Sequence, residues 1–197
     1  SASPMTPDYW PTACTHLSRK DRRMKRLIET YPEGTLRTRG DAFATLARSI
    51  VGQQISVRAA ETVWSRFHAA CGRVHPRWVL KLSHDEIRAC GLSNSKVAYI
   101  RDLSERFATG DIQPKRWDAM SDDEVIDDLT RVKGIGRWTV EMFLIFHLMR
   151  PNVYPVDDIG MVRAIEKLYN KGERMSKAEV REFGGRWDPW RSVATWY

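Results

Sequence analysis

The most informative segment spans residues 129–139 and reads LTRVKGIGRWT. A helical pattern runs into Val132, Gly134 and Gly136 follow two residues apart, and a new helical pattern begins directly after them. Two closely spaced glycines let the backbone turn sharply and bring bare amides close to an anion. The next helix adds its N-terminal amides and the positive end of its dipole, so the turn can hold a phosphate. An ordinary corner between two helices has the same spacing, but the basic neighbours favour the anion site: Arg131, Lys133 and Arg137.

Helical patterns continue on both sides of this segment. Three capping boxes mark helix starts, because the hydroxyl and the carboxylate of each box satisfy first-turn amides: Ser83 with Glu86, Ser121 with Glu124 and Ser176 with Glu179. Sustained alternation of apolar and polar residues, the mark of a strand, is almost absent. The sequence therefore predicts an all-α fold of roughly nine or ten short helices.

The two ends of the chain carry weaker boundary signals. Prolines among residues 1–14 predict an irregular arm, of which Ser1–Pro4, ahead of Met5, are expected to be a cloning remnant. Apolar residues at helical spacing then predict one helix over residues 17–31. Near the other end, Asp188-Pro189 reads as a helix cap with proline in the first turn.

Composition excludes several classes of protein. The chain has 197 residues, a net charge of +7 and a pI near 9.5, which favours a polyanionic partner such as nucleic acid. No apolar run reaches the roughly 18 residues of a membrane span. Three scattered cysteines exclude a disulfide framework, a zinc ribbon and a four-cysteine iron–sulfur cluster. We therefore expect a cytoplasmic protein that is not membrane-bound.

Two further polar segments interrupt apolar patterns. Asp157 and Asp158 precede an apolar helix, and one carboxylate is enough for its cap, which leaves the other for chemistry. Gly52, Gln53 and Gln54 form a polar corner between two apolar helices. This corner either presents a glutamine at an exposed tip or uses both glutamines to satisfy backbone groups.

These motifs together resemble a known family. Residues 129–158 resemble the helix-hairpin-helix DNA glycosylases, in which a Gly-x-Gly hairpin is followed by a Pro-x-Asp or Pro-x-Asp-Asp element. Residues 50–57, IVGQQISV, and residues 186–192, RWDPWRS, look like the alkylation-repair branch, the 3-methyladenine DNA glycosylase II family. The resemblance begins near residue 15 and implies the two-lobed HhH-GPD fold with a cleft between the lobes. It places the hairpin in a lobe of about residues 52–150, and residues 15–51 plus 151–197 in the other.

The resemblance implies roles for residues that would contact DNA. Gly134 and Gly136, with Thr139, match the amides that hold a phosphate, and Lys133 and Arg137 are basic neighbours of that site. Gln54 matches the wedge that enters the duplex where the target base leaves. The backbone carbonyls of three hairpin residues match those that bind a structural Na⁺ or K⁺: Thr130, Val132 and Gly134.

The resemblance also implies a catalytic site. Asp158 matches the family's catalytic carboxylate, and Asp157 matches its helix-capping neighbour. Four residues are expected to form the base pocket: Trp138, Met142, Trp187 and Trp190. No catalytic cofactor and no iron–sulfur cluster are expected.

The activity that the resemblance implies is hydrolytic excision of flipped, alkylated purines of the 3-methyladenine type from double-stranded DNA by a monomer. Such bases are cationic and leave without a general acid, while Asp158 stabilises the positive sugar and orients water. Because Trp138 stands where lyases of the family carry a lysine, we expect a monofunctional enzyme that leaves an abasic site. Two alternatives remain open: a non-catalytic helix-hairpin-helix DNA-binding module and a bifunctional glycosylase/lyase.

Overall fold

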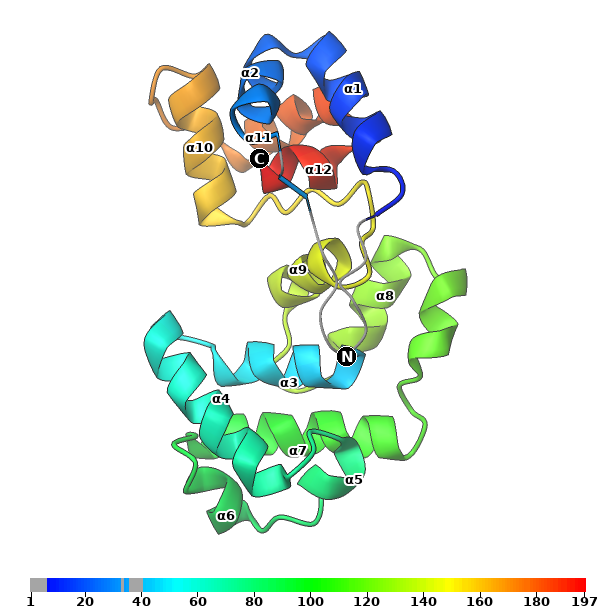
Figure 1. Cartoon of the computed structure of the whole chain (residues 1–197), viewed down its shortest axis with the longest axis vertical. Helices are drawn as coiled ribbons and strands as arrows, with labels where there is room; N and C mark the ends of the chain where they lie inside the picture. Colours follow the sequence, from blue (N-terminus) through cyan, green and yellow to red (C-terminus); the bar gives the residue numbers. More distant parts are fainter. Residues whose placement is uncertain (1–6, 33, 36–40) are drawn as a thin grey trace. The chain divides into compact units, whose positions relative to one another are not determined.

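The computed structural model describes residues 7–32, 34–35 and 41–197 (Figure 1). This part of the chain contains α-helices and short 3-10 helices and no β-strand, so the predicted all-α fold is confirmed. The α-helices are α1 (Trp10–Lys20), α2 (Arg22–Thr30), α3 (Ala42–Val51), α4 (Val57–Cys71), α5 (Pro76–Val79), α6 (His84–Arg88), α7 (Asn94–Ala108), α8 (Asp122–Leu129), α9 (Arg137–Phe146), α10 (Ile159–Tyr169), α11 (Lys177–Phe183) and α12 (Arg191–Trp196). The 3-10 helices are η1 (Pro114–Ala119) and η2 (Gly184–Trp187). None of the described helices is both long and apolar enough to span a bilayer.

The three capping boxes are confirmed, whereas boundaries at both ends of the chain were predicted wrongly. The boxes start α6, α8 and α11, each with both of its reciprocal hydrogen bonds. The predicted arm of residues 1–14 is wrong from Trp10 onward, because Pro11 lies in the first turn of α1, where its missing N–H is tolerated. The predicted Asp188-Pro189 cap is also wrong, because α12 begins at Arg191 with Trp190 as its N-cap.

The single helix predicted over residues 17–31 is two helices separated by Asp21. One carboxylate oxygen of Asp21 accepts the backbone N–H groups of Arg23 and Met24, which caps α2. Asp21 itself is extended, with φ −141° and ψ 114°, and this ends α1. The capping bonds satisfy first-turn amides that have no partner within the helix.

The chain divides into two compact units, and the division differs from the predicted lobes. Residues 39–140 form what we call the hairpin unit, and residues 1–38 with 141–197 form the terminal unit. Helix α3, predicted to lie outside the hairpin lobe, belongs to the hairpin unit because its apolar face packs on α7. The ring centroids of Phe43 and Phe107 lie 5.4 Å apart across that contact. The second boundary falls within α9 rather than near residue 150.

The hairpin unit has its core between α3, α4, α7 and α8. Figure 1 shows α3 along α7, with α5 and α6 on the other side of α7. Side chains at helical spacing on these helices are almost completely buried: Leu46, Ile50, Phe67, Val97, Ile100, Leu103, Val125 and Leu129. This core carries the loop before α9, in which the two glycines lie.

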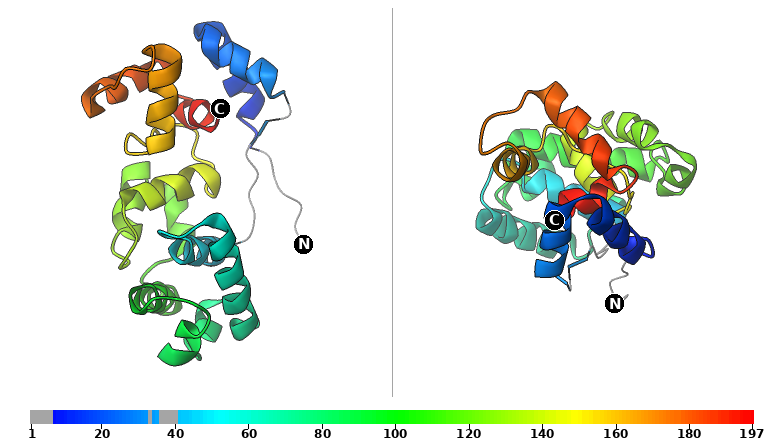
Figure 2. Two further views of the ribbon diagram at one scale, coloured as in Figure 1. Left: turned by 90° about the vertical axis from the view of Figure 1, so that its left-hand side faces the viewer. Right: turned by 90° about the horizontal axis from the view of Figure 1, so that it is seen from above.

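The terminal unit is built around aromatic residues and the buried carboxylate of Asp21. Helices α1 and α2 pack as a pair beside α12 (Figure 2), and Trp10 meets Trp196 edge to face at 5.6 Å. The second carboxylate oxygen of Asp21 accepts the indole N–H of Trp187 at 3.0 Å and the hydroxyl of Tyr169 at 2.9 Å. Asp21 therefore caps α2 and also fixes the Trp187 ring.

Candidate active site and DNA-binding hairpin

The loop between α8 and α9 is a tight turn that is stabilised by its own backbone hydrogen bonds and by two buried side chains. The N–H of Val132 bonds to Leu129 O at 3.1 Å, and the N–H of Ile135 bonds to Val132 O at 3.2 Å. Val132 and Ile135 are 1% and 4% exposed, so they anchor the turn in the core. The sequence-predicted helix–turn–helix is therefore present at residues 122–146.

The two glycines of the turn have different structural requirements. Gly134 has φ +82°, and a Cβ there would lie 2.2 Å from Cδ2 of Tyr99, so the fold itself requires glycine. Gly136 has no positive φ, and a Cβ there would meet nothing within 4 Å among the described atoms. Packing around the described residues thus gives no reason for glycine at position 136. A ligand that approaches the backbone would supply one.

A chain of ion pairs supports the turn and changes the interpretation of Arg131. Arg131 Nη1 lies 2.9 Å from Asp111 Oδ2, and its Nη2 pairs with Asp128. These hydrogen bonds raise the pKa of Arg131, and the bond from Arg131 lowers the pKa of Asp111. The sequence suggested Arg131 as a neighbour of the phosphate. In the structure its guanidinium instead forms ion pairs that stabilise the fold.

The side chain of Asp102 on α7 stabilises the turn by accepting a backbone N–H group of the turn. Its Oδ2 accepts the N–H of Lys133 at 2.9 Å and also pairs with Arg106 at 3.2 Å. The Lys133 side chain is exposed. Arg137 is exposed as well and makes a 3.4 Å ion pair with Asp123, while Thr139 is half-buried. Sequence analysis missed Asp102, because its partner lies 31 residues away.

The carbonyl set for a monovalent cation, Thr130 O, Val132 O and Gly134 O, stays a prediction. Backbone carbonyls are hard oxygen donors with two lone pairs, as such a cation requires. Val132 O accepts one hydrogen bond, and Thr130 lies at the C-cap of α8. Gly134 O also accepts one hydrogen bond, from the side-chain amide of Gln53 at 2.8 Å.

The two glutamines of the polar corner between α3 and α4 differ: one is exposed to solvent and the other hydrogen-bonds to the backbone. Gln54 is exposed and has φ +58°, an uncommon conformation for a residue other than glycine. Gln53 makes the Gly134 bond just described, across 81 residues of sequence. Lys96 Nζ donates to Val51 O at 2.8 Å, and burial lowers the Lys96 pKa. The backbone-satisfying alternative thus describes Gln53, whereas Gln54 lies at the tip.

The assignment of the paired aspartates needs a correction. Asp158, not Asp157, is the N-cap of α10, and its Oδ1 accepts the N–H of Met161 at 2.8 Å. Asp157 lies one residue before the cap and forms an ion pair with Lys177 at 2.8 Å. Asp158 is therefore held in one orientation by the helix that follows it.

A cavity of about 290 Å³ in the terminal unit contains Asp158. Its lining is apolar and aromatic, and Asp158 is its only carboxylate among the described residues: Met24, Leu27, Met142, Phe146, Asp158, Gly160, Met161, Ala164, Ile165, Leu168, Tyr169, Trp187, Ala194, Thr195 and Tyr197. Two of the four predicted pocket residues, Met142 and Trp187, are among them. Trp190 is not, and stacks on Tyr9 at 5.8 Å instead. Trp138, 49% exposed, lies in the hairpin unit one turn before Met142 on α9.

The hairpin, the polar corner and a helix-capping aspartate are the features on which the resemblance to the helix-hairpin-helix DNA glycosylases was based. Residues 47–189 match the HhH-GPD superfamily of base excision DNA repair proteins. The chain belongs to this family, so the predicted family and enzyme class are confirmed.

Individual relatives agree with this assignment. DNA-3-methyladenine glycosylase 1 of Schizosaccharomyces pombe is 31% identical over 92% of this chain and 83% of that one. Its structure in complex with abasic DNA has a TM-score of 0.79 to this chain, covering 94% of both. The crystal structure of a DNA-3-methyladenine glycosidase from Bacillus halodurans has a TM-score of 0.85 at 32% identity, covering 100% of this chain and 90% of that one.

Proposed function

We propose that this protein excises alkylated purines of the 3-methyladenine type from double-stranded DNA by hydrolysis and leaves an abasic site. The observation that carries the proposal is the capped carboxylate of Asp158 within an apolar, aromatic cavity of about 290 Å³. Relatives that share about a third of its residues carry the name of this activity.

The cavity chemistry suits a cationic base. Rotating a nucleotide out of the duplex costs a few kcal/mol, least where pairing is already weak. An aromatic face then favours a cation by roughly 0.5–2 kcal/mol, and Trp187 and Tyr169 offer such rings here. Because an alkylated purine is already positively charged, it leaves without a proton from a general acid. Asp158 would stabilise the positive sugar and orient the attacking water.

The hairpin unit would bind the DNA. The amides near Gly136 and Thr139 at the start of α9 would hold a backbone phosphate, with Lys133 and Arg137 beside them. Gln54, at the exposed corner, would fill the gap left by the flipped nucleotide and bond to the orphaned partner base. A Na⁺ or K⁺ held by the backbone carbonyls of Thr130, Val132 and Gly134 would add positive charge to this phosphate site.

One assay separates this function from a non-catalytic DNA-binding module. Purified protein is incubated with duplex DNA containing 3-methyladenine, and free base is measured by chromatography. We expect base release that depends on Asp158, and binding without release would contradict the proposal. A monomer should suffice, so the rate per chain should not change with protein concentration.

A second assay separates hydrolysis from lyase chemistry. Lyases form a Schiff base between an amine and the sugar, and the indole of Trp138 cannot do so. Borohydride added during the reaction should therefore trap almost no protein–DNA adduct. Substantial trapping would show that the enzyme is bifunctional.

A further inference from the structure

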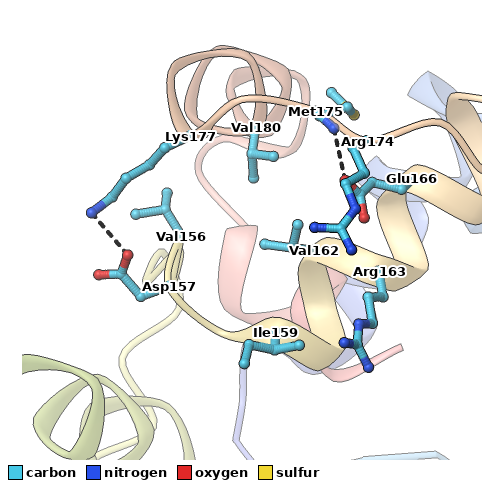
Figure 3. A pocket seen from close by; sticks show the side chains of 10 residues that line it. All are labelled: Val156, Asp157, Ile159, Val162, Arg163, Glu166, Arg174, Met175, Lys177 and Val180. Atoms are coloured by element: carbon cyan, nitrogen blue, oxygen red, sulfur yellow. Dashed lines mark hydrogen bonds and ion pairs between the residues drawn. The ribbon is translucent and has the colours of Figure 1, made fainter.

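A second cavity, of about 430 Å³, lies in the terminal unit beside the start of α10 (Figure 3). Its apolar lining consists of Val156, Ile159, Val162, Met175 and Val180. Three cationic side chains also line it, from α10, the α10–α11 loop and α11: Arg163, Arg174 and Lys177. Nothing in the proposed reaction so far uses these residues.

The start of α10 separates this cavity from the one that contains Asp158. Asp157 and Ile159 line the second cavity, whereas Asp158 and Gly160 line the first. Successive residues thus face alternate cavities. A ligand that reaches Asp158 is therefore only one residue along the backbone from the second cavity.

Each of the two carboxylates that line the second cavity has a partner within the protein. Asp157 pairs with Lys177 at 2.8 Å, and Glu166 Oε2 accepts the N–H of Met175 at 2.7 Å. In the described part of the chain neither Arg163 nor Arg174 has an ion-pair partner. Figure 3 shows both guanidinium groups away from the Lys177–Asp157 pair. Three cationic side chains thus line the cavity against two carboxylates, which leaves one positive charge in excess, because the N–H of Met175 does not neutralise Glu166.

We propose that this cavity binds a phosphodiester group of the DNA strand that carries the flipped nucleotide. The proposal rests on the proposed function, which places that nucleotide's sugar at Asp158. Sugar and flanking phosphates are covalently continuous, so the strand has to pass the start of α10. The planar fork of a guanidinium matches phosphate oxygens in charge and geometry. Ile159, 66% exposed at the cavity edge, gives the adjacent deoxyribose an apolar contact.

The salt dependence of DNA binding tests this site. The variants are Arg163→Ala, Arg174→Ala and both together, and Arg181→Ala is the matched control. Arg181 is an exposed arginine on α11 of the same unit and does not line the cavity. The dissociation constant for a duplex containing an abasic site is measured at several salt concentrations, with thermal melting as a check on folding.

Loss of one phosphate contact should lower the slope of log K against log salt by about 0.9. We expect this reduction, with about tenfold weaker binding, in the double variant and a smaller change in each single variant. Arg181→Ala should keep the wild-type slope. Arg181→Ala should also keep the wild-type rate of single-turnover base release, because Arg181 does not line the cavity.

The outcomes distinguish this site from the activity itself. If the cavity variants and the Arg181 control have the same slope, the proposed site is wrong, whatever the enzyme excises. If inorganic phosphate binds in the cavity while the double variant keeps wild-type DNA affinity, the ligand is a free phosphate and the proposal also fails. If the wild-type protein releases no alkylated base, the proposed function fails, and the slopes still report on phosphate binding.

Discussion

Asp158 has two tasks that a single substitution can separate. Its Oδ1 caps α10, and its charge is the feature that the proposed chemistry requires. Asparagine keeps an oxygen acceptor for the Met161 N–H and removes the charge. We expect Asp158→Asn to slow single-turnover base release by about a hundred- to a thousandfold, with DNA affinity and melting temperature close to wild type.

Asp157→Asn is the matched control for this prediction. It removes the same charge one residue away and breaks only the exposed pair with Lys177, whose two side chains are 57% and 48% exposed. Exposed pairs of this kind contribute little. Excision should therefore stay within a few-fold of wild type. Equal rates for the two variants would contradict the role of Asp158.

At the scale of elements, the hairpin glycines make a matched pair of substitutions. Gly134→Ala should destabilise the protein by about 3 kcal/mol, since φ +82° and the Tyr99 ring both oppose a Cβ. Gly136→Ala should leave stability almost unchanged, because its Cβ would point into open space. It should nevertheless weaken binding to all duplexes alike. Denaturant unfolding and DNA titration measure the two effects, and normal DNA binding by Gly136→Ala would exclude the close phosphate approach.

The corner between α3 and α4 is the second element with a separable role. Gln54→Ala should reduce excision from duplex DNA much more than from single strands, because only a duplex has a gap to fill. Fold stability should change little at this exposed position. Gln53→Ala is the comparison, since it removes the 2.8 Å bond to Gly134 but leaves the tip side chain. Equal losses by Gln54→Ala on both substrates would place Gln54 in the scaffold or the pocket.

The ion pairs between α7, the loop after it and α8 give the hairpin a pH dependence. Hydrogen bonds from Arg131 and Arg106 lower the Asp111 pKa in the folded protein. Stability from this group is therefore present above the unfolded pKa of about 3.9 and is lost as pH falls through the lowered folded value. The melting temperature of Asp111→Asn should lie below wild type at pH 7, and the difference should vanish in acid. A constant difference across that range would contradict the assignment.

At the scale of the whole molecule, the net charge of +7 predicts salt-sensitive binding without sequence preference. Backbone phosphates carry the same charge at every sequence, and each contact releases counterions. If about six phosphates are contacted, affinity should fall about a thousandfold between about 50 and 200 mM salt. Titrations on two undamaged duplexes of unrelated sequence should agree, and a sequence-specific footprint would contradict this view.

The sequence by itself determined the features whose physics is local. Capping boxes close within three residues, so Ser83, Ser121 and Ser176 could be placed without the fold. The Gly-x-Gly turn and the polar corner at residues 52–54 were equally evident, because two neighbouring helical patterns bound each of them. The family was recognised from three motifs in order along the chain, namely residues 50–57, 129–158 and 186–192.

Tertiary structure decided how similar neighbouring residues divide their roles. The sequence could not show which of Asp157 and Asp158 caps α10, since that depends on which residue is the last before the helix. It could not show that Gln53 bonds to Gly134 or that Asp102 holds Lys133, because those partners lie 81 and 31 residues away. Nor could it show that Arg163 and Arg174 share a cavity. Such pairings depend on the path of the whole chain, which no local pattern of residues encodes.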